Sequence, residues 1–333
     1  MNNDMHAEAI PYQNLTPETV LAAVESAGHA TSGHLLALNS YENRVYQVGL
    51  DAGGFIVAKF YRPGRWSDET ILEEHEFALE LAAQDIPAVS PLTDRSGHTL
   101  LRHDGFRFAL FPRRGGRAPE LDDPDNLRWL GRLLGRLHAV GATRRFAHRP
   151  ALSVERLGHE PYRYLTTHDF IPPELAHNYS QAIEQVLEIV EQQFSAVGPL
   201  RQLRLHGDFH PGNVLWTDDG PHFVDLDDCT SGPAVQDLWM LLSGSRDDME
   251  RQLSILLEEY AQFFDFDPLE LVLVEALRAL RLVHYSGWLA RRWHDPAFPM
   301  HFPWFNTPRY WEEQMLTLRE QLERLDAPTL KWR

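Results

Sequence analysis

The stretch HGDFHPGNVLWTDDGPHFVDLDD, from His206 to Asp228, is the part of this sequence that decides its fold. Two short apolar runs lie within it, Val214–Trp216 and His222–Val224, and the pair Asp219-Gly220 separates them. An Asp-Gly pair between two such runs is typical of a two-stranded β-hairpin. The pattern therefore predicts that the two outer ends of this hairpin meet.

Three polar side chains next to the predicted hairpin suit phosphoryl transfer from ATP. Asp208 precedes Asn213 by five positions, and the hairpin would bring Asn213 next to Asp225. In the catalytic loop of protein kinases, an Asp and an Asn at this spacing orient the acceptor hydroxyl and hold a metal ion. We therefore predict that Asp208 and Asp225 are catalytic. Asn213 and Asp225 are the predicted ligands of a Mg²⁺ ion that also binds the phosphates.

Two other interpretations of this stretch stay open. His206 and His210 flank Asp208, which is compatible with the zinc site of a metal hydrolase. Such a site needs a third nitrogen or sulfur ligand at a defined spacing, and the remaining histidines are scattered singly. A simple turn at Asp219-Gly220 is the second alternative, but it does not account for the acidic residues that follow the hairpin.

Composition narrows the class of protein. A chain of 333 residues with 43% hydrophobic residues suits two lobes, and a formal charge of −17 argues against a nucleic-acid binder. The start, MNNDMHAEAI, lacks the pattern of a secretion signal, and no apolar run reaches the length that spans a bilayer. The single cysteine, Cys229, fits a reducing compartment. We expect a cytoplasmic monomer that binds neither nucleic acid nor membrane.

The use of lysine provides a second clue. Of 31 basic residues only Lys59 and Lys331 are lysines, and Lys59 lies in the apolar β-type run Phe55–Tyr61. A strand lysine is a compact point charge that suits the α and β phosphates of a nucleotide. Its Val-Ala-Lys context resembles the lysine strand of protein kinases. A surface lysine on an edge strand is the alternative.

A lysine of this kind needs an acidic partner to hold it. The segment Asp68–Ala83 has helical periodicity, with Ser67 as a candidate N-cap. Among its glutamates we select Glu74 as the partner of Lys59, with Glu73 and Glu76 as alternatives.

Two loops are candidates for nucleotide contacts. Residues 39–43 join predicted strands at Leu35–Leu38 and Arg44–Leu50, and Ser40 with the backbone N–H groups of this loop is expected near the phosphates. A strand at Phe106–Phe111 ends at Pro112, where the free backbone groups around Leu110, Phe111 and Arg113 are expected to bind an adenine edge. We predict a hinge at about 109–117, a nucleotide-binding lobe at 1–112 and a mostly helical catalytic lobe at 113–333. Later helices of this lobe are predicted at Pro173–Val197, Ala234–Leu242, Met249–Phe264 and Pro268–Trp293.

Taken together, these motifs resemble a known family. HGDFHPGN followed by VDLDD, the helix GRLLGRLHAVG and the lysine strand look like the aminoglycoside phosphotransferase and choline kinase group. LNSYENRVYQ, VAKFYRPGRWS and GPAVQDLWMLL resemble, within this group, a subfamily of bacterial stress response kinases. The resemblance implies an α+β, protein-kinase-like fold with a small antiparallel sheet in one lobe and a larger helical lobe.

The same resemblance implies an activity. The subfamily is expected to phosphorylate serine and threonine of proteins with ATP and Mg²⁺, to autophosphorylate, and to act in stress survival. The resemblance assigns catalysis to Asp208, metal binding to Asn213 and Asp225, and a place near ATP to Ser40. Asp237 matches the Asp that braces the catalytic loop.

Two other functions remain as alternatives. A small-molecule kinase for an aminoglycoside, choline or homoserine is compatible with the fold and with the acidic charge. A pseudokinase would be expected to lack one of the central residues, all of which are present. Only 11 residues separate Asp225 from Asp237, which leaves no room for a long activation loop. A polypeptide acceptor would have to bind the helical lobe, for example at the aromatic segment Trp288–Trp311, although core packing is the favoured reading of that segment.

Overall fold

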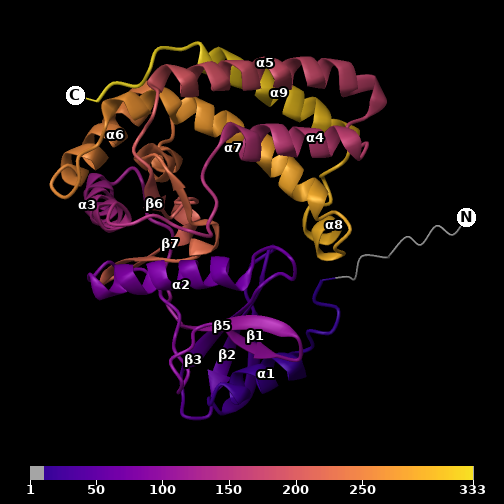
Figure 1. The fold of residues 1–333 in the computed structure, drawn as a ribbon, viewed down its shortest axis with the longest axis vertical. Helices are drawn as coiled ribbons and strands as arrows, with labels where there is room; N and C mark the ends of the chain where they lie inside the picture. The colour runs from indigo at the N-terminus through magenta and orange to yellow at the C-terminus, as the bar shows by residue number, and fades with distance from the viewer. Residues whose placement is uncertain (1–10, 333) are drawn as a thin grey trace, which may run out of the picture. The chain divides into compact units, whose positions relative to one another are not determined.

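The computed structural model describes residues 11–332, which form two compact units. Unit 1 contains residues 11–79, 89–114 and 293–303, and unit 2 contains residues 80–88, 115–292 and 304–332. Figure 1 shows the course of the chain through the helices and strands of both units. The predicted absence of a secretion signal concerns residues 1–10, which lie outside the described residues.

Unit 1 is built on a five-stranded antiparallel sheet with the order β1-β2-β3-β5-β4. The strands are β1 (Thr31–Ala37), β2 (Arg44–Leu50), β3 (Phe55–Phe60), β4 (Leu101–His103) and β5 (Phe106–Pro112). Lys59 lies on the central strand, opposite Val45 on one side and Ala109 on the other. The turn from β2 to β3 contains Gly53 and Gly54 at φ 89° and 81°, a conformation that favours glycine.

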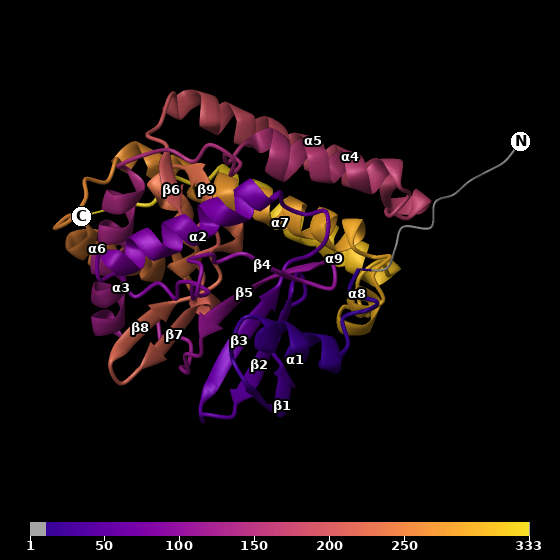
Figure 2. The same ribbon diagram turned by 60° about the horizontal axis from the view of Figure 1, so that its bottom comes forward.

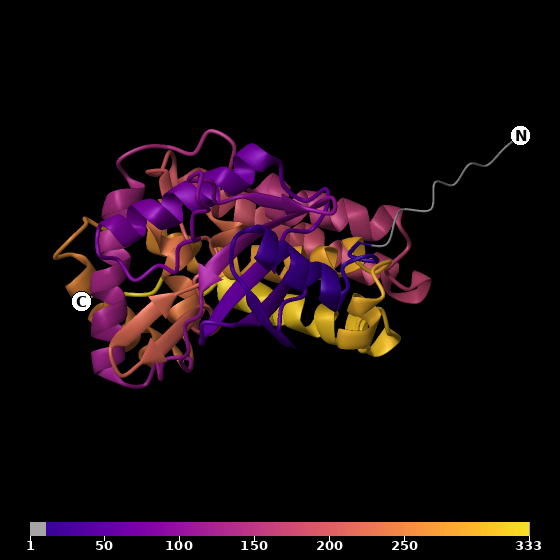
Figure 3. The ribbon, with the colours of Figure 1, turned by 90° about the horizontal axis from the view of Figure 1, so that it is seen from below.

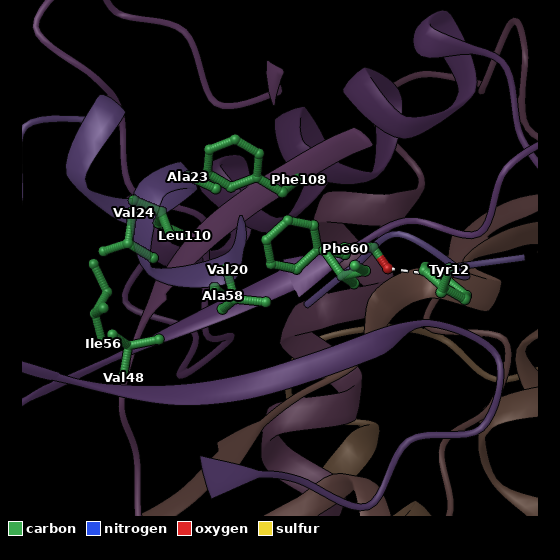
Figure 4. Packing of buried hydrophobic residues seen from close by; sticks show 11 residues of the cluster. Tyr12, Val20, Ala23, Val24, Val48, Ile56, Ala58, Phe60, Phe108 and Leu110 are labelled. Carbon is green, nitrogen blue, oxygen red and sulfur yellow. Dashed lines mark hydrogen bonds between the residues drawn. The ribbon is translucent and has the colours of Figure 1, made fainter. Parts of the chain in front are cut away.

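Helix α1 (Pro17–Ser26) covers one face of this sheet (Figure 2). Thr16 caps the helix by accepting the N–H of Thr19, and Pro17 suits the first helical position because its missing N–H would have no partner there. The buried side chains of α1 pack onto Ile56, Phe60 and Phe108 (Figure 4). The Tyr12 hydroxyl donates to the Phe60 carbonyl at 3.2 Å. This core fixes β3 and therefore the position of Lys59.

Unit 2 is mostly helical. Its helices are α3 (Pro124–Gly141), α4 (Glu160–Thr167), α5 (Pro173–Val197), α6 (Arg246–Tyr260), α7 (Val274–Arg291) and α9 (Pro308–Leu325), whereas the short α8 (Ala297–His301) belongs to unit 1. Helix α4 packs on α7 and α5 on α9, as Figure 1 shows. Helices α3 and α6 touch closely, because a Cβ on Gly131 would lie 2.3 Å from the Leu256 carbonyl oxygen. The glycines of GRLLGRLHAVG therefore serve packing.

Two small strand pairs complete unit 2. Strand β6 (Leu203–Leu205) pairs with β9 (Thr230–Gly232), and β7 (Val214–Thr217) pairs with β8 (Gly220–Phe223) as a hairpin, the pair of salmon arrows in Figure 3. Thr217 pairs with Gly220, so the turn is Asp218-Asp219 and not the predicted Asp219-Gly220. Gly220 opens β8 at φ 110°. The hairpin itself is confirmed.

One predicted helix is wrong. Ala234–Leu242 forms two short 3₁₀ turns, Ala234–Asp237 and Trp239–Leu241. Almost every side chain of this segment is buried, and long-range bonds replace the helical ones: the Val235 N–H donates to the Glu270 carboxylate at 2.8 Å. The predicted helix at Pro268–Trp293 begins as a 3₁₀ segment, Pro268–Leu273, before α7. The α+β class, with a small antiparallel sheet and a larger set of helices, is confirmed.

Candidate active site

The loop between β6 and β7 holds Asp208 in a compact arrangement. The Asn213 amide donates to the Asp208 carbonyl oxygen at 2.9 Å, and the Gly212 N–H donates to Nδ1 of His210 at 3.0 Å. Gly207 has φ 84°, and a Cβ at this position would lie 2.2 Å from the Asp228 carbonyl oxygen. The glycine before the predicted catalytic Asp is therefore required by backbone contact as well as by conformation.

Asp237 holds this loop in place through hydrogen bonds to its backbone, which confirms the predicted bracing role of Asp237. Its carboxylate accepts the backbone N–H groups of His206 and Gly207, both at 2.8 Å. Nε2 of His138, on α3, lies 3.2 Å from the same carboxylate, and Asp237 is completely buried. A buried carboxylate that accepts two backbone N–H bonds fixes the peptide directly before Asp208.

The hairpin brings Asn213 and Asp225 together, as predicted. The Val224 N–H donates to the Asn213 carbonyl at 3.0 Å, and Nε2 of His206 donates to the Val224 carbonyl at 2.9 Å. Asp225 adopts a left-handed backbone conformation, φ 60° and ψ 64°. For a residue other than glycine this conformation is uncommon and is characteristic of functional sites.

The donor set fits magnesium. Asn213 and Asp225 supply an amide and a carboxylate, and Mg²⁺ is usually held by one or two carboxylates with water and substrate phosphates completing its shell. Within residues 11–332 no group of three or more histidine, cysteine, aspartate or glutamate side chains is placed to hold a metal. The zinc alternative is not supported, because His206 Nε2 donates to a backbone carbonyl and His210 Nδ1 accepts the Gly212 N–H.

Two side chains contact the carboxylate of Asp208, the guanidinium of Arg281 and the imidazole of His210. Arg281, on α7, lies 2.5 Å from Oδ1, and Nε2 of His210 lies 3.5 Å from Oδ2. Burial alone would raise the pKa of Asp208, but the hydrogen bonds and charges of His210 and Arg281 hold it well below its usual range. Asp208 is therefore an anion at neutral pH. Sequence reasoning missed Arg281, which is 73 residues from Asp208 along the chain.

In unit 1, Lys59 and Glu74 form a buried ion pair. Nζ of Lys59 lies 3.2 Å from Oε1 of Glu74, and the two side chains are 8% and 4% exposed. Glu74 belongs to α2 (Asp68–Ala83), which Ser67 caps by accepting the Thr70 N–H at 3.2 Å. The choice of Glu74 as the partner is confirmed, whereas the nucleotide-binding role of both residues stays a prediction.

The other predicted nucleotide contacts also lie in unit 1. Ser40 is half-buried in the loop between β1 and β2. Phe111 lies in β5, and Nε of the exposed Arg113 donates to the Gln47 side chain at 3.2 Å. The predicted free backbone around Leu110 is wrong in one respect, because its carbonyl accepts the Leu92 N–H at 2.7 Å. The roles of Ser40, Phe111 and Arg113 at a nucleotide stay predictions.

Two further sequence features have structural explanations. Cys229 is completely buried, and Arg149 Nε donates to its carbonyl at 2.8 Å, whereas a redox sensor needs an accessible thiol. In the aromatic segment, buried rings predominate, so the preference for core packing is confirmed for Phe298, Phe302, Phe305, Tyr310 and Trp311. Trp288 and Trp293 are half-buried, and Trp304 is 45% exposed. No helix within residues 11–332 is long and apolar enough to cross a membrane.

Known proteins resemble this chain in sequence and in fold. A model of the phosphotransferase enzyme family matches residues 34–272. Stress response kinase A of Escherichia coli (strain K12) is 44% identical over 327 residues, and the match covers 98% of each chain. The serine/threonine protein kinase RdoA of Salmonella typhimurium (strain LT2) is also 44% identical over 327 residues, again 98% of each chain. Among solved structures, amicoumacin kinase hAmiN in complex with AMP-PNP, Ca²⁺ and Ami has a TM-score of 0.70 at 18% identity, over 94% of this chain and 95% of that one.

Proposed function

The chain belongs to the phosphotransferase enzyme family and is a kinase of the stress response type, and from this premise we propose that it is an ATP- and Mg²⁺-dependent serine/threonine protein kinase. The observation that carries the proposal is the fixed position of Asp208. Asp237 holds the peptide before it, Asn213 holds its carbonyl, and Arg281 and His210 contact its side chain. The name of the Salmonella relative, a serine/threonine protein kinase, supports a protein acceptor.

In the proposed reaction, Asp208 positions the hydroxyl of a serine or threonine. The hydroxyl oxygen forms a bond to the γ-phosphorus of ATP while the bond from that phosphorus to the β,γ-bridging oxygen breaks, and ADP leaves. Asp208 accepts the proton of the hydroxyl and later releases it to water. Because Arg281 and His210 each contact one of its two oxygens, the carboxylate is pre-oriented and loses little freedom on binding the acceptor.

Mg²⁺, when bound by Asn213 and Asp225, would neutralise charge on the phosphate oxygens. Lys59 would contribute a further positive charge to the phosphates, and Glu74 would hold its ammonium in place. Ser40 is proposed to donate to a phosphate oxygen or to accept a phosphoryl group in slow autophosphorylation. In this scheme the lobe up to residue 112 binds the nucleotide, and the lobe from residue 113 carries the catalytic residues and the acceptor.

The proposal is tested with γ-labelled ATP and Mg²⁺. The protein is incubated alone, with a generic protein acceptor, and with a panel of small alcohols that includes an aminoglycoside, choline and homoserine. We expect label in protein on serine or threonine, in the chain itself and in the acceptor. The same incubation with Asp208→Ala is the control for contaminating kinases. Label found only in a small alcohol would overturn the proposal.

A small-molecule kinase is the second candidate function. It is supported by the fold of the amicoumacin kinase, and by the short segment between Asp225 and Asp237, which contains only 3₁₀ turns and β9. A protein kinase with this segment has no activation loop on which to align a peptide. The acceptor polypeptide must therefore use another surface.

A further inference from the structure

The loop of residues 39–43, which joins β1 to β2, contains no glycine, and none of its residues has a positive φ. Its own backbone therefore supplies no tight turn that would fix its shape. The shape depends instead on contacts with two other segments of unit 1. One is the connection between β3 and α2, and the other is residues 293–303, which we call the α8 segment.

Arg62, in the connection between β3 and α2, holds the end of the loop. Its backbone N–H donates to Oδ1 of Asn43 at 3.1 Å, and its Nε donates to the Glu42 carbonyl at 3.0 Å. Nε also lies 3.1 Å from Oε1 of the Glu42 carboxylate. The Arg62 side chain is 7% exposed and Asn43 is 3% exposed. Two consecutive loop residues are therefore bound to one buried arginine.

Asp295, in the α8 segment, fixes that arginine in turn. Its Oδ2 lies 2.6 Å from Nη2 of Arg62 and 3.5 Å from Nη2 of Arg44, and its side chain is 2% exposed. Nη1 of Arg44 donates to the Tyr41 carbonyl at 3.1 Å. The other oxygen of Asp295, Oδ1, accepts the N–H of Ala297, the first residue of α8, at 3.1 Å. One buried carboxylate oxygen thus holds two arginines that contact residues 41–43.

The rings of α8 pack onto the same loop. The Tyr41 ring lies 5.1 Å from His301 and 4.8 Å from Phe302, measured between centroids. The Arg62 guanidinium lies over the ring of Phe298 at 5.5 Å, and both phenylalanines are buried. The α8 segment is remote in sequence, because 251 residues separate Arg44 from Asp295. A distant part of the chain therefore determines the conformation of this loop.

We propose that Asp295 is a positioning residue for ATP: through Arg62 and Arg44 it keeps the loop 39–43 in its nucleotide-binding conformation before the nucleotide binds. The inference rests on the proposed kinase function, in which Ser40 and the backbone of this loop meet the phosphates. A loop that is ordered in advance loses little conformational freedom on binding, so affinity is not reduced by ordering. Asp295 itself touches neither nucleotide nor acceptor in this scheme.

The first test is Asp295→Asn. Asparagine keeps the size of the side chain and an oxygen for the Ala297 N–H, but it removes the charge and turns an NH₂ group toward Arg62. Loss of one partner of a buried ion pair changes an equilibrium by about a hundredfold. The matched control is Asp51→Asn, the same chemical change at an exposed position of unit 1, beyond the opposite end of β2.

Hydrogen exchange in the absence of nucleotide measures how firmly the loop is held. The Leu38 N–H donates to the Val45 carbonyl at 2.8 Å, and the Arg62 N–H donates to Asn43, so these two amides report opening at both ends of the loop. In Asp295→Asn we expect their exchange to accelerate about a hundredfold, and in Asp51→Asn to stay at the wild-type rate. Unchanged exchange in Asp295→Asn would overturn the proposal.

Nucleotide binding and turnover test the role in positioning. The Kd of a non-hydrolysable ATP analogue with Mg²⁺, and KM for ATP, should rise about three- to tenfold in Asp295→Asn. Affinity changes less than exchange, because it falls only with the fraction of molecules whose loop is open. At saturating ATP the bound nucleotide orders the loop, so kcat should stay within about twofold of the wild type. A general loss of folded protein would instead lower kcat and leave KM unchanged.

A second variant covers the case in which Asp295→Asn does not fold. Tyr41 is 38% exposed, so Tyr41→Ala removes the ring that contacts α8 without opening a cavity in the core. We expect faster exchange of the Leu38 N–H and a Kd for the ATP analogue about threefold higher, with kcat unchanged. Wild-type exchange and wild-type Kd in this variant would overturn the proposal.

The outcomes separate this inference from the proposed function. Faster exchange with unchanged Kd and KM would show that the α8 segment only stabilises unit 1, and would overturn the positioning role. Weaker binding of the ATP analogue by Asp295→Asn supports the positioning role even if the wild-type protein transfers no label to any protein or small alcohol. That absence of transfer would overturn the kinase function alone.

Discussion

Replacement of Asp237 by asparagine tests how the catalytic loop is held. The carboxylate accepts the N–H groups of His206 and Gly207 at 2.8 Å each, from a completely buried position. Asparagine has one oxygen, so it can accept only one of these N–H groups, and its amide would face the other. The loss of one charge-assisted bond and the burial of an unpaired N–H together cost about 3 kcal/mol. We expect Asp237→Asn to lower the free energy of unfolding by about this amount.

Activity should fall as well, because the peptide that Asp237 holds directly precedes Asp208. A displacement of about 1 Å in a reacting group can reduce turnover about a hundredfold. The assay combines urea denaturation with kcat for labelled phosphate transfer, and ATP affinity should stay within a few-fold of the wild type. The control is Asp219→Asn in the exposed hairpin turn, where we expect a change within about 0.5 kcal/mol. A variant at position 237 with the stability and turnover of this control would refute the bracing role.

Four further predictions follow from the site and its surroundings. Asp208→Ala should abolish transfer and leave ATP affinity within a few-fold, which turnover and binding assays check; normal turnover would exclude Asp208 as the catalytic residue. Asp225→Asn should remove Mg²⁺-dependent nucleotide binding, and unchanged binding in a titration would mean that the ligand assignment is wrong. Lys59→Arg should reduce turnover at least about tenfold, which corresponds to about 1.4 kcal/mol, because the planar guanidinium of arginine replaces the compact ammonium group beside Glu74. Full activity of this variant would mean that Lys59 has only a structural role. Burial raises the pKa of Glu270 to about 7, above the value of about 4.3 for an unfolded chain, so the folded protein loses stability as the pH rises through this window. Glu270→Gln, which keeps an acceptor for the Val235 N–H, should flatten that loss in urea titrations between pH 4 and pH 8.

Local sequence signals predicted the elements that hold the site. The bounds of α2 and its cap at Ser67 follow from helical periodicity and a capping residue, which act within a few positions along the chain. The ion pair of Lys59 and Glu74 spans only 15 residues between one strand and the next helix. Both predictions relied on the types and spacing of residues that are close together along the chain.

Contacts between residues that are far apart along the chain were not predicted from the sequence. Arg281 lies on α7, and its pairing with Asp208 depends on how α7 packs, which no local pattern encodes. The same is true of His138, which reaches Asp237 over 99 residues. The 3₁₀ turns at Ala234–Leu241 replace a predicted helix because buried side chains and long-range bonds outweigh intrinsic propensity there. Tertiary packing therefore decided the features that sequence reasoning missed.

The left-handed backbone of Asp225 affects how inactive variants of this protein should be designed. At φ 60° and ψ 64°, aspartate and asparagine are tolerated because their short polar side chains bond locally, whereas alanine would add about 1–2 kcal/mol of strain. An alanine variant would therefore combine two defects, a missing carboxylate and a distorted loop end, and a loss of nucleotide binding would not identify which defect caused it. Asparagine changes only the charge. Asp225→Asn is consequently the variant that tests the role of the carboxylate in metal binding while the native loop geometry is kept.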